Sequence, residues 1–211
     1  MRRKNITSEM MMGYIQQALL LLMKDKAYPD ITIGEITAKA GVNRSTYYRH
    51  FDTKESIIHS YLDSIMETYQ QRFQQLHSQD FTLYLRTMFE TFYENKENLI
   101  HIHRSGLSYM LLDVLLARFH FDEIPSDQQF RISYHIGGIN SNMLLWFAHD
   151  MMETPDEMTI IALKCGAEKT MSLFRGSPPA PAEKSPSESQ DRGCFLQSTA
   201  GVVRSSVQPF S

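Results

Sequence analysis

The chain has 211 residues, of which 42% are hydrophobic and 21% are charged, and its formal net charge is −3. This ordinary globular composition excludes a fibrous repeat and wholesale disorder. Two cysteines are too few for a disulfide framework, which favours a reducing compartment. No window approaches the roughly 20 apolar residues of a transmembrane helix, and the N-terminus lacks a secretory cleavage site. We therefore predict a soluble, cytoplasmic protein.

The charge is distributed unevenly along the chain. Residues 1–54 carry a net charge of +4, whereas residues 55–211 carry −7. A basic end on an acidic body suits a protein that grips a polyanion with one end. The N-terminal quarter is therefore the first place to look for a binding surface.

Helical periodicity dominates the sequence, and no segment alternates with a period of two between hairpin turns. We therefore predict an all-α protein. The first helix is expected from about residue 8 to 24. Its apolar positions recur at helical spacing on one face, at Ile15, Ala18, Leu19 and Leu22.

Three further helices follow at short intervals. Thr32 and Glu35 form a capping-box pattern that starts a helix over 33–40. Gly41 can end it, because glycine readily takes the left-handed conformation of a helix stop. Asn43 can cap a third helix over 44–51, and a long fourth helix is predicted over 54–75. The remaining helices are expected at 80–94, 96–104, 107–119, 126–150 and 156–174.

The pair of short helices around Gly41 has the layout of a helix-turn-helix. In that arrangement the first helix braces the second, which enters the DNA major groove. Val42, Tyr47 and Phe51 are predicted to face inward. The polar side chains of the second helix are predicted to lie on or near its outer surface: Arg44, Ser45, Thr46, Tyr48, Arg49 and His50. No carboxylate occurs between residues 42 and 51, as suits a surface that meets phosphates.

The segment 31–55 closely resembles the DNA-binding domain of the tetracycline-repressor (TetR) family of transcriptional regulators. The matching residues are Ile31-Thr32-Ile33, Ala40-Gly41-Val42, Thr46-Tyr47-Tyr48, Phe51 and Lys54-Glu55. The resemblance extends over residues 8 to about 56, and Thr37 departs from the alanine that the family often has there.

The resemblance implies two kinds of DNA contact. It assigns Thr32, Tyr48 and Lys54 to phosphates, which fix the register of a protein on DNA. It assigns base or groove contacts to a set that varies between family members: Arg44, Ser45, Thr46, Arg49 and His50. A lysine at residue 54 opposes the helix dipole, and a phosphate would explain it. The basic residues 2–4, expected ahead of the first helix, can add backbone or minor-groove contacts.

Three domains are predicted: a helix-turn-helix DNA-binding domain over 1–55, a helical effector-binding and dimerisation domain over 56–175, and a disordered tail over 176–211. The tail is rich in proline and serine and lacks periodic apolar positions. Residues 134–146 and 154–158 are more loosely similar to a C-terminal domain of one branch of the family.

The resemblance also implies a homodimer formed by the helices near 126–150 and 156–174, and two-fold symmetry predicts a palindromic operator. Gly137 and Gly138 lie inside the first of these helices. Because glycine weakens a helix, we expect a close helix–helix approach at both positions.

An effector pocket in this family would have an apolar and aromatic lining, for which plain core packing is the competing interpretation. The candidates are Met66, Met88, Phe89, Phe92, His103, Tyr109, Met110, Met143 and Trp146. His101 and His103 point about 200° apart on a helix, so they do not form a metal pair. We expect no metal site and no cofactor.

The sequence predicts a DNA-binding transcriptional regulator, specifically a ligand-responsive repressor that binds double-stranded DNA as a dimer. The first alternative is a protein-interaction module or coactivator that kept the fold without binding DNA itself. An enzyme is not expected, because phosphate-loop, zinc-protease and nucleophile-elbow motifs are missing.

Overall fold

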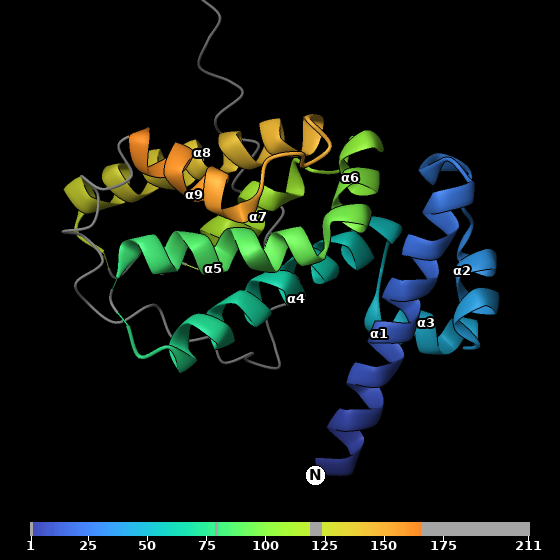
Figure 1. Cartoon of the computed structure of the whole chain (residues 1–211). Coiled ribbons are helices and arrows are strands. Elements are labelled where there is room, and N and C mark those ends of the chain that lie inside the picture. The colour runs from blue at the N-terminus through green and yellow to red at the C-terminus, as the bar shows by residue number, and fades with distance from the viewer. Residues whose placement is uncertain (1, 79, 119–123, 166–211) are drawn as a thin grey trace, which may run out of the picture. The chain divides into compact units, whose positions relative to one another are not determined.

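The computed structural model describes residues 2–78, 80–118 and 124–165. Within these ranges every regular element is helical, as Figure 1 shows, which confirms the all-α prediction. None of the described helices is long and apolar enough to cross a membrane. The predicted tail, 176–211, lies outside the described residues.

The first four helices lie close to their predicted positions. They are joined by short turns and by a 3-10 helix, η1, and run as follows: α1 Arg2–Asp25, η1 Tyr28–Asp30, α2 Ile33–Ala40, α3 Arg44–His50 and α4 Lys54–Gln75. The largest difference is the start of α1, which lies six residues before the predicted one.

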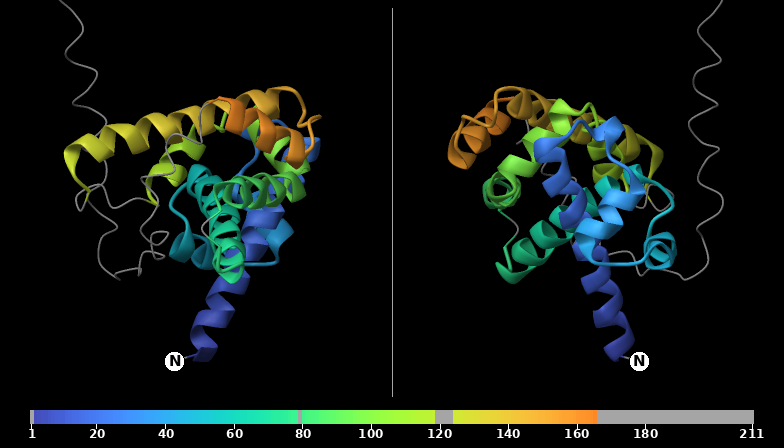
Figure 2. Two further views of the ribbon diagram at one scale, coloured as in Figure 1. Left: turned by 60° about the vertical axis from the view of Figure 1, so that its left-hand side comes forward. Right: turned by 90° about the vertical axis from the view of Figure 1, so that its right-hand side faces the viewer.

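The early start of α1 has a simple cause. Residues 2–12 contain no glycine or proline and consist largely of good helix formers, so the helix can begin well before the predicted start. The buried positions that guided the sequence analysis begin only at Ile15. The basic residues 2–4 are therefore part of α1 and do not form an extended arm ahead of it. Figure 2 shows this end of the helix projecting beyond α2 and α3.

The helices of the body also follow the prediction. They are α5 Phe81–Glu94, α6 Lys96–Arg104, α7 Met110–Leu116, α8 Ser126–Ala148 and α9 Pro155–Lys164. The seventh helix is shorter than the expected 107–119, because Gly106 takes a left-handed conformation (φ 73°) and turns follow it. Residues 166–174 of the expected last helix lie outside the described part.

A continuous apolar core connects these helices. α4 leaves the helix-turn-helix and packs against α5 and α7, while α5 also packs against α9. The ring of Trp146 is central, because Phe89 meets it edge-on at 5.6 Å between centroids and Tyr93 stacks on it at 5.9 Å. Its indole N–H donates to the carbonyl of Glu153, 3.0 Å away, so its polar atom is satisfied. All described helices lie in one compact unit, and the boundary after residue 55 stays a prediction.

Candidate nucleic-acid interface

The turn between α2 and α3 fixes where α3 begins. Gly41 takes the predicted left-handed conformation, with φ 66°. The side-chain oxygen of Asn43 then accepts hydrogen bonds at 2.7 Å from both the backbone N–H of Thr46 and the hydroxyl of Ser45. These bonds satisfy donors that the first turn of a helix otherwise leaves without a partner.

The inner face of α3 holds it against the rest of the domain. Tyr47 and Phe51 are buried together with Ile36 of α2, as the sequence analysis predicted, and Val42 is half-buried. The rings of Tyr47 and Phe51 lie 6.2 Å apart between centroids. Burial raises the pKa of Tyr47 to about 12, so its hydroxyl is neutral at physiological pH. These contacts leave the opposite side of α3 facing outward.

Three side chains of the outer face carry donors that no described residue uses. Arg44, Ser45, Tyr48 and Arg49 are exposed, with Tyr48 at 56%, while Thr46 and His50 are half-buried. Within the described residues, the side chains of Arg44, Tyr48 and Arg49 make no hydrogen bond and no ion pair. Such donors suit contacts to phosphates and base edges.

Two details shape this outer face. The guanidinium of Arg44 lies beside Gly34 of α2, where an added Cβ would come within 3.3 Å of Nη2. Burial, and then the positive charge of Arg49, lowers the pKa of His50. His50 is therefore largely neutral at pH 7 and offers one ring N–H donor and one acceptor.

Thr32 is occupied by its own helix. Its hydroxyl donates to the Glu35 carboxylate at 2.8 Å and accepts from the backbone N–H of Glu35 at 3.2 Å, which completes the predicted capping box. Lys26 donates to the other oxygen of that carboxylate at 2.8 Å. These bonds, led by that from Lys26, lower the pKa of Glu35 to about 2. The phosphate contact of Thr32 stays a prediction, because its hydroxyl proton already has an acceptor.

Lys54 is likewise held inside the chain. Its ammonium faces backbone carbonyls of η1, one of them at 3.0 Å. The phosphate role that the resemblance gives to Lys54 is thus also untested. Of the predicted phosphate ligands, Tyr48 is the one that presents a free donor in the described structure.

The predicted effector residues are dispersed through the core. Seven are buried: Met66, Met88, Phe89, Phe92, Met110, Met143 and Trp146. Nδ1 of the half-buried His103 lies 3.0 Å from the hydroxyl of Ser108, while Tyr109 is 61% exposed. The structure brings Phe89 and Trp146 together but places Tyr109 at the surface. The role of the set in effector binding stays a prediction.

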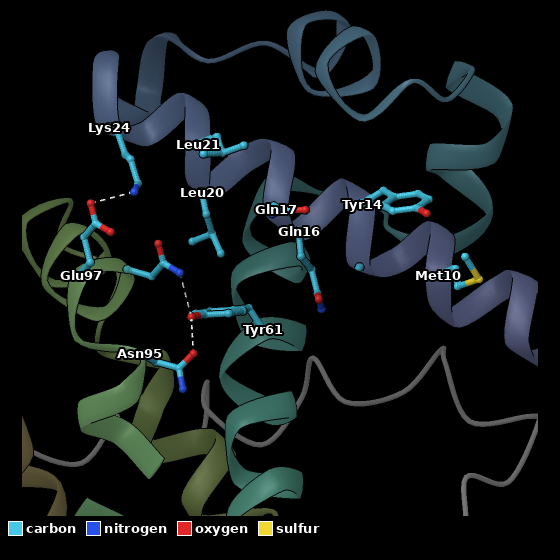
Figure 3. A pocket seen from close by; sticks show the side chains of 12 residues that line it. Met10, Tyr14, Gln16, Gln17, Leu20, Leu21, Lys24, Tyr61, Asn95 and Glu97 are labelled. Atoms are coloured by element: carbon cyan, nitrogen blue, oxygen red, sulfur yellow. Dashed lines mark hydrogen bonds and ion pairs between the residues drawn. The ribbon is translucent and has the colours of Figure 1, made fainter. Parts of the chain in front are cut away.

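A groove of about 640 Å³ runs between α1 and the starts of α4 and α6 (Figure 3), and none of the nine effector candidates lines it. Its walls include Met10, Tyr14 and Leu21 of α1. The available sequence signal was that these three residues are large and apolar but lie outside the apolar row predicted for the first helix. Across the groove lie Tyr61 and Asn98.

Polar contacts join the walls of this groove. Lys24 of α1 pairs with Glu97 of α6 at 2.7 Å. The hydroxyl of Tyr61 donates to the side-chain oxygen of Asn95 at 2.9 Å and accepts from the amide of Asn98 at 3.0 Å. The first helix and the body are therefore connected through α4 and α6.

An apolar face is open on α8 and α9. Phe130, Tyr134 and Leu145 are 76%, 87% and 57% exposed, and their spacing places them along one side of α8. Ile160 and Ile161 are exposed on α9. No described helix of the same chain approaches Gly137 or Gly138, because a Cβ there would meet no atom within 4 Å. The approach of a second copy at these positions stays a prediction.

The described residues contain no group of three or more histidine, cysteine or acidic side chains that could hold a metal ion. His101 and His103 lie on α6 as expected, two residues apart on one continuous helix.

The helix-turn-helix segment is similar to known proteins. Residues 15–61 match the model for bacterial regulatory proteins of the tetR family, from α1 to the second turn of α4. The chain is 26% identical over 185 residues to YxbF of Bacillus subtilis (strain 168), an uncharacterised HTH-type transcriptional regulator. That alignment covers 81% of this chain and 48% of YxbF, so the chain spans about half the length of this curated relative.

Among solved structures, the chain is similar to Thermus thermophilus FadR, a TetR family transcriptional repressor in complex with lauroyl-CoA. The TM-score is 0.48 at 18% sequence identity, and the match covers 82% of this chain and 100% of that one.

Proposed function

We propose that this chain is a sequence-specific DNA-binding transcriptional regulator, because residues 15–61 match the model for bacterial regulatory proteins of the tetR family. It acts as a ligand-responsive repressor that binds a palindromic operator as a homodimer. The observation that carries this proposal is the outer face of α3. There Arg44, Tyr48 and Arg49 present donors that no described residue uses, on a helix anchored from behind by Tyr47.

The proposed contacts divide by chemistry. Tyr48 donates to a phosphate and positions the domain, whereas Arg44 reads a guanine through two hydrogen bonds. Ser45, Thr46, Arg49 and His50 add groove contacts. Thr32 reaches a phosphate only if its hydroxyl leaves Glu35, so we give it the smallest share of the affinity.

The dimer is proposed on the apolar face of α8 and α9. Phe130, Tyr134 and Leu145 are large apolar side chains that lie exposed along one side of α8, and contiguous exposed apolar patches are typical of interaction sites, which supports the proposal. Gly138 lies on the same side and leaves room for a second helix to approach. A two-fold axis through this face gives two copies of α3, as a palindromic site requires.

The ligand response is proposed to pass through α4 and α6. A ligand in the body changes operator affinity by its differential affinity for two arrangements of the dimer. The Lys24–Glu97 pair links α1 to α6, and Gln16 of α1 donates to the hydroxyl of Ser60 of α4 at 3.0 Å. The hydrogen bonds of Tyr61 join α4 to the start of α6. Movement of α6 therefore shifts the helix-turn-helix, and with it the spacing of the two recognition helices from the roughly 34–36 Å of successive major grooves.

Selection of bound duplexes from a random pool, followed by affinity measurements over a salt series, tests this function. We expect the full chain to enrich a palindrome, with log K falling linearly as log salt rises. The Arg44→Ala, Arg49→Ala variant should lose the enrichment. A chain that enriches no sequence, or binds without dependence on salt, contradicts the proposal and favours a protein-interaction module.

The dimer has a separate test. Tyr134→Glu places a charge on the proposed interface, and Tyr109→Glu, the same change at an exposed tyrosine outside α8 and α9, is the matched control. We expect sedimentation analysis to show a dimer for the native chain and the control, and a monomer for Tyr134→Glu. A dimer that survives Tyr134→Glu together with Phe130→Glu contradicts this placement.

A further inference from the structure

Lys54 occupies a position where a positive charge is unfavourable. It is the first residue of α4, and a helix N-terminus carries the positive end of the helix dipole. A DNA phosphate is one way to offset that cost. The structure shows a different set of partners inside the chain.

Backbone carbonyls surround the ammonium of Lys54. Nζ donates to the carbonyl oxygens of Tyr28 at 3.0 Å, Pro29 at 3.3 Å and Ile31 at 2.7 Å. These groups belong to η1 and the residue that follows it. The Tyr28 carbonyl also accepts from the backbone N–H of Ile31 at 3.2 Å, which the two lone pairs of a carbonyl oxygen allow. An ammonium has three N–H donors, so three carbonyls account for its donor capacity.

The side chain of Tyr28 contacts both Lys54 and Glu55. The ammonium of Lys54 lies 4.6 Å from the centroid of its ring, which adds a cation–π attraction. Its buried hydroxyl donates to Oε1 of Glu55 at 2.8 Å. Burial acts to raise the pKa of Glu55, but hydrogen bonds from its own backbone N–H, Tyr28 and Thr53 outweigh it and lower the pKa. Glu55 is therefore an ionised acceptor at neutral pH.

These contacts join two ends of the helix-turn-helix. η1 leads through Ile31 into Thr32, the N-cap of α2, while Lys54 and Glu55 follow the end of α3. The entry to α2 and the exit from α3 are thus tied across more than 20 residues of sequence. Loosening this tie leaves α3 helical but frees its orientation relative to α2 and α4.

We infer that Lys54, held by Tyr28 and the carbonyls of η1, is an internal positioning residue that orients the recognition helix and does not bind a DNA phosphate itself. The inference rests on the proposed DNA-binding function. It assigns Lys54 a role opposite to the one that the family resemblance implies for this position.

The test compares two lysines in the full chain. We call the contacts of Lys54 with Tyr28 and with the carbonyls of η1 the clamp. Lys54→Met removes the clamp, whereas Lys39→Met removes an exposed lysine of α2 that has no hydrogen bond or ion pair to any described residue. The probe is a duplex that the native chain selects from a random pool, and its affinity is measured over a series of KCl concentrations. We expect Lys54→Met to weaken binding about tenfold, a change of about 1.4 kcal/mol, with an unchanged slope of log K against log salt.

The slope separates the two roles. Loss of one phosphate contact reduces its magnitude by about 0.9, so a reduction of that size in Lys54→Met overturns the inference. Positioning also predicts that Lys54→Met narrows the ratio of affinities for the selected and a random duplex. A ratio equal to that of the native chain argues against positioning and overturns the inference as well.

Tyr28→Phe changes no charge, and it provides a second test of the clamp if the Lys54→Met variant does not fold. It removes the hydrogen bond to Glu55, so the clamp predicts a loss of affinity of a few-fold, whereas native affinity contradicts it. If the native chain selects no duplex, the proposed DNA-binding function is wrong, and melting temperatures then test whether the clamp stabilises the fold. The clamp predicts a lower melting temperature for Lys54→Met than for Lys39→Met, and equal melting temperatures contradict the clamp.

Discussion

The outer face of α3 and the start of α4 are only a few residues apart, yet the structure uses their polar side chains in opposite ways. Arg49 and Tyr48 project from α3 with no hydrogen-bond acceptor in the described chain, whereas Lys54 donates to three backbone carbonyls. The comparison teaches that a basic or hydroxyl residue in a binding motif is available to DNA only when the fold leaves its donors free.

Two adjacent tyrosines of α3 show the same contrast between a side chain that the fold uses and one that it leaves exposed. Tyr47 is fully buried and braces the domain, while Tyr48 meets it edge-on at 5.2 Å between ring centroids and stays exposed. Because successive residues of a helix point about 100° apart, one ring can serve the core and the next the surface.

The largest effect that tests this contrast is on stability. Tyr47→Ala empties a fully buried site and should lower the free energy of unfolding by about 3–5 kcal/mol, as large aromatic truncations in cores do. Tyr48→Ala should change it by about 0.5 kcal/mol or less, since exposed substitutions usually do so. Urea denaturation of both variants measures the difference. Equal losses would break the division into an inner and an outer face.

The next effect concerns DNA discrimination. Arg44→Ala should cost about 1–3 kcal/mol of preference for the selected base pair, because a two-pronged contact to guanine is lost. Its stability should stay near the native value, since the guanidinium makes no hydrogen bond or ion pair with the described residues. Affinities for the selected duplex and its single-base variants provide the measurement. An undiminished preference would place base reading elsewhere on the domain.

A smaller effect is expected at Gly34, behind the guanidinium of Arg44. Gly34→Ala should stabilise the chain by about 0.5–1 kcal/mol, because alanine is the better helix former. Its Cβ would come within 3.3 Å of Nη2 of Arg44, so this mobile group must shift. We expect a changed base preference with higher stability in thermal melts. A lower stability would show that Arg44 cannot move aside.

The smallest effect is a pH dependence at the capping box of α2. The pKa of Glu35 is about 2 in the folded chain, below its ordinary value of 4.5, so the unfolded chain takes up the proton first as the pH falls. The ionised Glu35 carboxylate therefore adds to the free energy of unfolding above pH 4.5, and this stabilisation is lost as the pH falls through about 2. The stability difference between the native chain and Glu35→Gln should shrink over that range in urea titrations. A constant difference would contradict the ion pair with Lys26.

Local patterns predicted most of the fold and part of the site. Capping residues such as Thr32 and Asn43, and the glycine stop at residue 41, fixed α2 and α3 because each acts within a few residues. The inward side of Tyr47 followed from helical spacing. The start of α1 was missed because the apolar positions used to place this helix begin only at Ile15.

Long-range contacts set the rest of the site. The carbonyls that receive Lys54 lie 23 to 26 residues earlier in the chain, and no local rule joins them. The Lys24–Glu97 pair that links α1 to α6 spans 73 residues. A list of apolar and aromatic candidates likewise could not separate buried Met66 from exposed Tyr109, because their burial depends on how distant helices pack.

The central claim, that the outer face of α3 meets DNA, can be tested with one photocrosslinking probe at two exposed tyrosines. A benzophenone amino acid replaces Tyr48 on α3 in one variant and Tyr109, in the body, in the other; these side chains are 56% and 61% exposed. After irradiation with the selected duplex, we predict covalent protein–DNA product from position 48 and none from position 109. Product from position 109 alone would contradict the account.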